Sequence, residues 1–277
     1  MLYYGYYQKE DPWFNYEIWH SNGHPFRGPI PILEKDYISF LGAGQVFGRY
    51  ASFPFPTLIH NFLGVECANF GTAGHGPSSP FFWDNLDVIN RGQLAVVTVM
   101  SGRSVSNKYW TTWSNHGKNE ITGEHCVGQA FWEYVINKFE ADKIIELVLE
   151  TRVQYVKEFK ELFGAITVPV IFLFMSKSGY SNETIDTTNI DNLFGRFPQM
   201  INKHTVMNIA EEADEFVEII YQSELERFPF PQENKYAQKF LGKPKRVMTH
   251  NSYYPTTEEH FAVYDTLAPV IKKILDN

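Results

Sequence analysis

The chain contains Tyr37-Ile38-Ser39-Phe40-Leu41-Gly42-Ala43-Gly44-Gln45-Val46-Phe47-Gly48-Arg49-Tyr50, in which an apolar segment leads directly into a glycine-rich turn. Residues 37–41 are expected to form a buried strand, because they are mostly apolar and a turn signal follows them. Ligands of open α/β proteins bind beyond the carboxyl ends of the parallel strands, so this turn is a candidate ligand site. The turn itself contains no serine, cysteine or other nucleophile.

Two further strands are expected to end in polar turns. Residues 65–70 are predicted to form a short strand that leads into a glycine-rich turn at 69–77. Residues 93–100 form a continuous β-branched run, typical of a central parallel strand, and they precede a turn at 101–107. The other predicted elements are strands at 168–175, 204–209 and 245–249, and helices at 56–62, 79–90, 126–139, 141–163, 189–201, 211–221 and 257–275. This alternation predicts an α/β fold, a three-layer open parallel sheet of the flavodoxin-like type.

The N-terminal segment differs from the rest of the chain. Residues 1–36 are rich in aromatic residues and proline and show no sustained helical or alternating period. We expect them to form an extended aromatic arm that packs on a single domain comprising residues 37–277. Residues 108–125 are predicted to be an irregular insertion, and segments of that length inside a compact domain are often functional.

The composition limits the classes of function. The 277 residues are 44% hydrophobic and 20% charged, as in an ordinary globular protein. A net charge of -8 gives no reason to expect nucleic-acid binding. Two cysteines cannot form a disulfide framework, and no segment approaches the ~18 apolar residues of a membrane span. Because the N-terminus also lacks the pattern of a secretory leader, we expect a cytoplasmic protein without a membrane span.

The order of the turns resembles that of the SGNH (GDSL-like) class of esterases and acyl transferases. In that class the first turn carries the nucleophilic serine, the second and third contribute a glycine amide and an asparagine to the oxyanion hole, and a late turn carries aspartate and histidine. Here Gly42-Ala43-Gly44 occupies the first position and residues 69–74 match the second. Ser104 or Asn107 would replace the asparagine, and Tyr254 stands where the histidine is expected. The resemblance therefore implies an SGNH-like fold with a degenerate catalytic triad.

A closer resemblance, over about residues 16–180, is to a family of uncharacterised bacterial proteins. The shared motifs are Arg27-Gly28-Pro29, Leu41-Gly42-Ala43, Phe47-Gly48-Arg49, Pro54-Phe55-Pro56 and the run from Ser101 to Asn107. A weaker similarity is to capsule-polysaccharide acetyltransferases of SGNH-like fold, whose first turn is Gly-Asn-Cys-Gln; Gly42 and Gln45 are kept here and the cysteine is not. The first resemblance names a family without naming a reaction, and the second implies a role in bacterial surface-polysaccharide metabolism.

Two arginines on the predicted turns are candidates for binding an anion. The guanidinium groups of Arg49 and Arg103 can hold phosphate, sulfate or carboxylate with paired hydrogen bonds. The alternative is that each pairs with a carboxylate such as Asp84 or Asp87. The serines of the third turn have two roles open to them, as a displaced nucleophile activated by a histidine or as caps of the turn.

The predicted site draws on all three turns and on the late segment. Its catalytic candidates are Gly74, His75, Ser104 and Asn107. The resemblance to the SGNH class implies that the Gly74 amide and Ser104 or Asn107 would stabilise an oxyanion. Its ligand-binding candidates are Gly42, Gln45, Arg49, Asn69, Ser101, Arg103 and Tyr254. No metal or cofactor is expected, because metal-ligand pairs and the dinucleotide-binding glycine spacing are absent from the sequence. Two functions remain open: an ester hydrolase or acyl transferase acting on a glycan or anionic small molecule, or a non-catalytic small-molecule or glycan binding protein.

Overall fold

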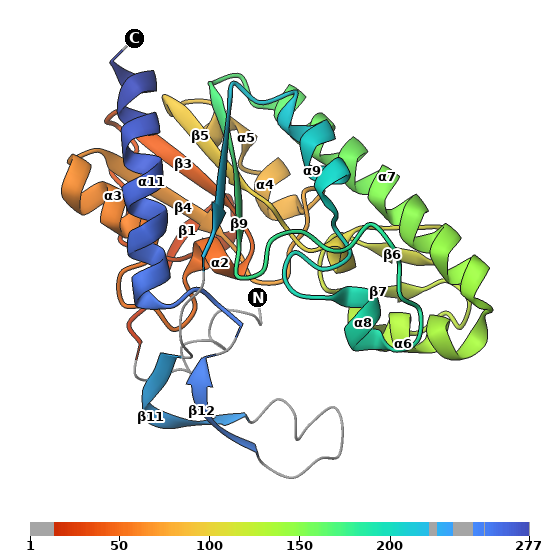
Figure 1. Ribbon diagram of the computed structural model, residues 1–277. Helices are drawn as coiled ribbons and strands as arrows, with labels where there is room; N and C mark the ends of the chain where they lie inside the picture. The colour runs from red at the N-terminus through yellow and green to blue at the C-terminus, as the bar shows by residue number, and fades with distance from the viewer. Residues whose placement is uncertain (1–13, 222–225, 235–245, 252, 277) are drawn as a thin grey trace.

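The centre of the molecule is a five-stranded parallel sheet (Figure 1). The computed structural model describes residues 14–221, 226–234, 246–251 and 253–276. The strands are β3 (Tyr37–Gly42), β4 (Glu66–Gly71), β5 (Leu94–Thr98), β9 (Val170–Ser176) and β10 (Glu215–Ile220). Their order across the sheet is β4-β3-β5-β9-β10, which is the 2-1-3-4-5 order of flavodoxin-like doubly wound folds. The α/β fold class expected from the sequence is confirmed.

Helices cover both faces of this sheet, which produces the three layers (Figure 1). One face packs against α2 (Gly44–Phe47), α3 (Phe55–Leu63) and α11 (Thr257–Leu275). The other packs against α4 (Pro80–Trp83), α5 (Leu86–Ile89), α7 (Ala141–Ala165) and α9 (Lys203–Ala210). Every residue of β3, β5 and β9 is buried, because successive side chains point to opposite faces and both faces are covered.

The segment between β9 and α11 departs from the sequence-based prediction. Residues 204–209 were predicted to be a strand and form helix α9 instead, because the Asn202 side chain caps its first turn and Val206 and Ile209 face the core at helical spacing. The predicted helix at 211–221 is wrong as well. It contains strand β10, in which Val217 and Ile219 alternate with exposed residues and pack on the sheet.

Two other predicted helices are much shorter in the structure. The helix predicted at 79–90 is divided into α4 and α5, which are separated at Asp84 and Asn85. Of the helix predicted at 189–201, only α8 (Ile190–Phe194) forms, and Gly195 ends it with a positive φ. The remaining residues form part of a long connection from β9 to α9.

The insertion predicted to be irregular is an ordered antiparallel sheet. It comprises β6 (Trp110–Thr112), β7 (His116–Asn119) and β8 (His125–Val127), and it follows the short 3-10 helix η1 (Gly102–Ser104). Helix α6 (Gly128–Lys138) continues from β8, so the predicted helical start at Cys126 is two residues early. The Trp110 and Phe131 rings stack at 4.8 Å and link the insertion to α6.

The described part of the N-terminal arm forms a small hairpin and packs into the core. Its strands β1 (Trp19–Ser21) and β2 (His24–Phe26) pair antiparallel. The rings of Trp19 and Phe26 contact that of Phe70 in β4, at centroid distances of 5.5 and 4.9 Å. The hydrophobic effect therefore attaches the arm to the end of the sheet where β4 leads into its turn.

The last predicted strand is present and lies outside the central sheet. Residues of the prediction at 245–249 fall in β12 (Arg246–Asn251), apart from Lys245, which is outside the described residues. β12 pairs antiparallel with β11 (Glu226–Asn234) in a separate two-stranded sheet (Figure 1).

Candidate functional site

The first turn is tight because glycine is required on it. A Cβ at Gly42 would lie 2.0 Å from Thr98 Oγ1 and 2.5 Å from Val46 Cγ2, and a Cβ at Gly44 would lie 2.5 Å from Tyr254 Cε1. Helix α2 therefore begins directly on β3, and the late segment containing Tyr254 packs on it. Of the residues predicted from the sequence, Gly42 thus lies close to Thr98 and Val46, and Tyr254 lies against the same turn at Gly44.

A buried arginine of the N-terminal arm fixes the loop after α2. Its guanidinium donates to four carbonyl oxygens, those of Phe47, Gly48, Ala51 and Ser52. Burial lowers the pKa of Arg27 to about 10, with the neighbouring Tyr16 and Glu17 acting in the opposite direction. The Arg27 guanidinium also lies 5.0 Å from the Tyr16 ring centroid. Because this loop carries Arg49, the arm determines where that side chain lies.

Arg49 and Arg103, from two different strand turns, converge on adjacent tyrosines. The Arg49 guanidinium lies 5.7 Å from the ring centroid of Tyr254 and hydrogen-bonds with its side chain. Arg103 Nη2 donates to the hydroxyl of Tyr253 at 3.2 Å, and the two tyrosine rings are 4.9 Å apart. Burial raises the pKa of the Tyr254 hydroxyl, and the charge of Arg49 opposes this shift.

The alternative partners considered for the arginines are occupied by the N-terminal arm. Asp84 Oδ2 is 2.8 Å from His24 Nε2, and Asp87 accepts from Asn22 Nδ2 at 3.0 Å. Among the described residues Arg103 forms an ion pair with no carboxylate; its hydrogen bonds go to the hydroxyls of Ser101 and Tyr253. Its positive charge is thus not neutralised by any described side chain.

Two predicted polar residues of the first two turns lie within the protein. Asn69 donates from Nδ2 to the Val46 carbonyl at 3.0 Å and accepts from the Gly71 amide at 2.8 Å, so it connects the first two turns. Gln45 is buried on α2, and its Nε2 has no hydrogen-bond partner among the described residues. A buried amide without a partner is costly, which makes Gln45 a candidate for contact with a ligand or water.

The three serine hydroxyls of the third turn are engaged in local hydrogen bonds. Ser101 caps η1 and accepts from the backbone and side chain of Arg103, both at 3.2 Å. Ser104 donates to the Gly74 carbonyl at 2.8 Å, and Ser106 donates to a carbonyl of β6 at 2.8 Å. These bonds stabilise the turn, as serines following a strand commonly do.

The other two predicted oxyanion donors, Gly74 and Asn107, lie in different surroundings. Gly74 has a φ of +79°, and a Cβ at this position would lie 2.6 Å from Asn115 Oδ1. Its amide forms no hydrogen bond to a described residue, so that donor remains open. Asn107, by contrast, donates to Thr151 Oγ1 at 3.1 Å and accepts from the Tyr109 amide at 3.0 Å, which holds it against α7.

His75 is buried and neutral. Its Nδ1 is 2.8 Å from Ser79 Oγ, and its ring contacts Phe81 at 4.4 Å and Trp113 at 5.2 Å. Burial lowers the pKa of His75 to about 3, and the positive charges of His24 and His116 add to the shift. The hydroxyl of Ser79 is fully buried and also caps α4, so this serine–histidine pair lies inside the protein.

The structure adds residues that sequence reasoning did not select. Tyr253 accepts from Arg103 and also from Gln199 Nε2 at 3.1 Å, and Gln199 Oε1 has no partner among the described residues. His260 is fully buried, accepts from the Phe55 amide at 3.2 Å, and has its pKa lowered to about 3 by burial. Adjacency to Tyr254 could have indicated Tyr253. No pattern in the sequence indicated Gln199, which comes from the connection after β9.

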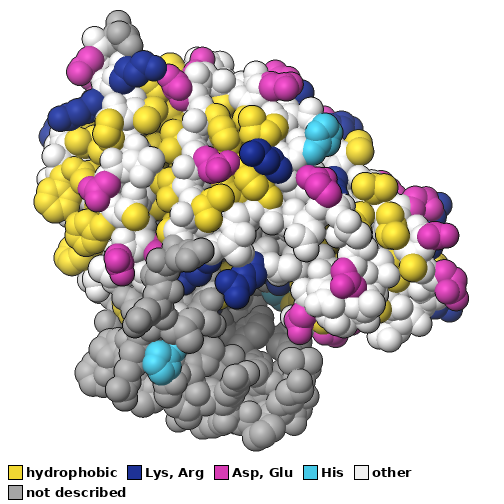
Figure 2. Space-filling view, in the orientation of Figure 1, with side chains coloured by type: hydrophobic (Ala, Val, Ile, Leu, Met, Phe, Trp, Pro, Cys, Tyr) yellow, Lys and Arg dark blue, Asp and Glu magenta, His cyan; other side chains and the backbone are white. Residues whose placement is uncertain are grey.

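The described residues also limit the kinds of site. No helix among them combines the length and apolar character that a bilayer crossing requires. No group of three or more His, Cys, Asp or Glu side chains that could hold a metal occurs in the described ranges. On the face shown in Figure 2, acidic and basic side chains are interspersed over the described surface.

The chain is thus a doubly wound α/β protein. Arg49, Arg103, Tyr253 and Tyr254 form an arginine–tyrosine cluster beyond the carboxyl ends of its parallel strands. Residues 9–117 match the family model described as Domain of unknown function (DUF6473). No curated protein matches the chain significantly.

Solved structures that are similar to this chain share little of its sequence, as three examples show. One is a carbohydrate esterase whose active site displays divergent catalytic and non-catalytic binding functions (12% identity, TM-score 0.44, covering 90% of this chain and 68% of that chain). The second is a carbohydrate esterase family 2 enzyme plus carbohydrate binding domain from Corynascus thermopiles (Myceliophthora fergusii) (12%, 0.43, 93% and 71%). The third is a protein from Lactobacillus plantarum (11%, 0.42, 86% and 97%). At such low similarity, none of them assigns a role to a residue of this chain.

Proposed function

We propose that this chain is a non-catalytic binding protein for an anionic carbohydrate ligand, held at the carboxyl edge of the sheet by Arg49 and Arg103. The observation that carries the proposal is the convergence of these two side chains on Tyr253 and Tyr254. Guanidinium groups bind carboxylate, sulfate or phosphate through paired hydrogen bonds, and tyrosine rings and hydroxyls are suited to a sugar.

The hydrogen bonds and burial of the candidate nucleophilic serines support binding rather than catalysis. A serine nucleophile needs an accessible hydroxyl and a base within about 3 Å of it. The hydroxyls of Ser101, Ser104 and Ser106 instead form hydrogen bonds within the third turn, to the Gly74 carbonyl and to β6, respectively. Ser79, which does form a hydrogen bond with a histidine, is fully buried. The similarity to carbohydrate esterases concerns the fold, and fold does not by itself determine activity.

Binding at Arg49 and Arg103 is tested by titration calorimetry with sulfate, phosphate and a sulfated disaccharide. We expect the sulfated disaccharide to bind the unaltered protein and Arg103→Ala to weaken it by at least about tenfold, the effect of losing a charged hydrogen bond. Arg91→Ala is the matched control, because Arg91 is exposed and its side chain forms a hydrogen bond, among the described residues, only with the Asp87 carbonyl. Equal binding by Arg103→Ala would contradict the proposal.

Catalysis is tested separately with acetylated sugars. The proposal expects no release of acetate above the uncatalysed rate from the unaltered protein. If acetate is released and Ser104→Ala abolishes the release, the chain is an esterase and the binding proposal is wrong.

A further inference from the structure

An exposed tryptophan lies on the insertion, in the connection between β6 and β7. Trp113 is 43% exposed, and its Nε1 forms no hydrogen bond with a described residue. Its ring is nevertheless held in place, because it contacts the rings of His75 at 5.2 Å and Phe81 at 6.5 Å. An indole that is rigid, apolar on its faces and open at its N–H group can stack on a sugar ring and donate to one of the sugar oxygens.

Two further donors lie beside this tryptophan. Asn115 is two residues along the same connection, and the side chain of Ser114 between them is buried, so Trp113 and Asn115 project to the same side. The Asn115 amide group lies against Gly74, since a Cβ at Gly74 would be 3.1 Å from Asn115 Nδ2. Asn115 Oδ1 is 2.9 Å from His116 Nδ1, whereas Asn115 Nδ2 and the Gly74 amide have no partner among the described residues. Two N–H groups are thus open to ligand oxygens.

Backbone hydrogen bonds hold this part of the insertion in one conformation. The amide of Asn115 donates to the Gly74 carbonyl at 2.5 Å, and the Gly76 amide donates to the Trp113 carbonyl at 3.0 Å. The Gly128 amide, at the start of α6, donates to the Asn115 carbonyl at 2.8 Å. The tryptophan and the open donors are therefore in position before a ligand binds, which reduces the entropic cost of binding.

The second turn connects the insertion with the arginine–tyrosine cluster. The Gly74 carbonyl accepts at 2.8 Å from the hydroxyl of Ser104, which is adjacent in sequence to an arginine of the cluster. Ala73 belongs to a small apolar core on which both Tyr254 and Phe81 pack. Because one of these rings is part of the cluster and the other contacts the exposed tryptophan, the two groups of residues lie on either side of the same turn.

The two sides of the turn differ in charge. The exposed tryptophan and the two open donors form no hydrogen bond or ring contact with Lys, Arg, Asp or Glu in the described ranges. Burial lowers the pKa of His116, so the ring beside Asn115 is neutral at pH 7. Asp84 is 2.8 Å from Nε2 of His24, whose ring contacts that of Phe81 at 4.2 Å. The insertion side therefore suits an uncharged sugar, and the arginine side an anionic group.

We propose that Trp113 stacks on an uncharged sugar while Asn115 Nδ2 and the Gly74 amide donate to its oxygens, so that the ligand is an oligosaccharide with an anionic group at one end. This inference rests on the proposed function, because Arg49 and Arg103 bind the anionic group of the same ligand. It adds a second contact region, on the insertion, and a requirement for more than one sugar.

The test is titration calorimetry of the full chain with glucose 6-sulfate and with cellotetraose that carries one sulfate, on C6 of either its reducing or its non-reducing glucose. Glucose 6-sulfate is a single ring, so it contacts the arginines without reaching the insertion. We expect the better tetrasaccharide isomer to bind at least about tenfold more tightly, since a tryptophan in contact with a ligand commonly contributes this much. The preferred isomer gives the direction in which the oligosaccharide crosses the turn.

Variants assign this difference to the insertion. Trp113→Ala should lower the affinity for the tetrasaccharide to about that for glucose 6-sulfate, and Asn115→Ala should lower it to a smaller extent. Retained binding of glucose 6-sulfate shows that each variant is folded. Trp83→Ala is the matched control and should change neither affinity, because Trp83 is 37% exposed but its Nε1 donates to the Pro77 carbonyl at 3.1 Å.

The outcomes separate this inference from the proposed function. Equal affinity for the two kinds of probe, or an unchanged preference for the tetrasaccharide in Trp113→Ala, would overturn the inference. If Arg103→Ala weakens both probes in that case, the proposed function stands. Absence of binding by all probes would overturn the proposed function and this inference together.

Discussion

Arg27 Nη1 donates a hydrogen bond to the carbonyl oxygen of Phe47 at 3.0 Å, and this bond joins the N-terminal arm to the end of α2. The same guanidinium bonds to three further carbonyls of the following loop. The arm is thus part of the structure that positions Arg49.

Replacing this arginine should destabilise the protein. Arg27→Met leaves four carbonyl oxygens without their donor, and we expect a loss of about 3 kcal/mol in the free energy of unfolding. Urea denaturation followed by tryptophan fluorescence measures the loss. The control Arg91→Met, at an exposed position, should change it by about 0.5 kcal/mol or less. A similar value for both variants would show that the bonds of Arg27 contribute little.

Acid should destabilise the fold through its buried histidines. The pKa values of His75 and His260 are lowered to about 3 in the folded chain, against about 6.5 when unfolded. The unfolded chain therefore binds more protons between pH 6.5 and 3, so stability is lost as the pH falls through this window. Between pH 7 and pH 5 the expected loss is about 2 kcal/mol for each histidine.

Substitution of one histidine should reduce this acid sensitivity. His260→Gln retains an acceptor for the Phe55 amide and removes the titrating group, so its free energy of unfolding should fall less between pH 7 and 5. His20→Gln, at an exposed position of β1, is the control and should fall as the unaltered protein does. An unchanged pH dependence in His260→Gln would show that this histidine is not the group responsible.

The first turn should not tolerate a methyl group. Gly42→Ala places a Cβ 2.0 Å from Thr98 Oγ1, and we expect a loss of about 1–3 kcal/mol from overpacking. Gly164→Ala is the matched control, because Gly164 lies in α7 with no atom within 4 Å of its added Cβ. That change should stabilise by about 0.5–1 kcal/mol through helix propensity. Thermal unfolding should therefore show a loss of stability in Gly42→Ala and a gain in Gly164→Ala. A change of the same sign in both variants would contradict the packing argument.

The start of α11 should depend on Glu259. Its carboxylate accepts from the Thr256 amide at 2.7 Å in a capping box and lies 3.2 Å from Lys177 Nζ. Glu259→Ala should cost about 2 kcal/mol, and Glu259→Gln about 1 kcal/mol, since an amide oxygen can retain the cap but not the charge. Glu258→Ala, on the exposed side of the same turn, should cost about 0.5 kcal/mol or less, as urea titration would measure. Equal losses at Glu258 and Glu259 would contradict the capping argument.

Local pattern was sufficient for most of the sheet. Strands β3, β5 and β9 are mostly apolar runs, as expected of strands that are buried on both faces, and β4 is a short segment that leads into a glycine turn. The local sequence pattern was not sufficient to predict the structure between residues 203 and 221. There the β-branched residues of α9 resemble a strand and the acidic residues of β10 resemble a helix face, and packing against the sheet decided both.

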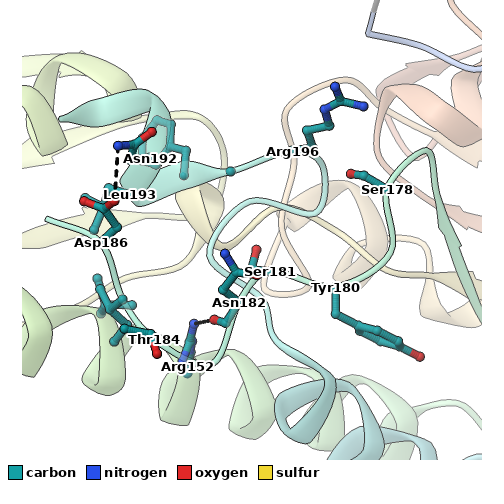
Figure 3. A pocket seen from close by; sticks show the side chains of 14 residues that line it. Arg152, Ser178, Tyr180, Ser181, Asn182, Thr184, Asp186, Asn192, Leu193 and Arg196 are labelled. Atoms are coloured by element: carbon teal, nitrogen blue, oxygen red, sulfur yellow. Dashed lines mark hydrogen bonds between the residues drawn. The ribbon is translucent and has the colours of Figure 1, made fainter. Parts of the chain in front are cut away.

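The sequence by itself determined four of the five parallel strands, the glycine-containing turns that follow three of them and the two arginines on those turns, because strand patterns and turn chemistry act over a few residues. Only the tertiary structure determined which side chains those arginines contact. Tyr253 and Tyr254 are separated from Arg103 by about 150 residues of chain and reach it through the packing of α11. The hollow lined by α7 and the connection after β9 (Figure 3) also depends on the tertiary structure, because that connection packs against α7.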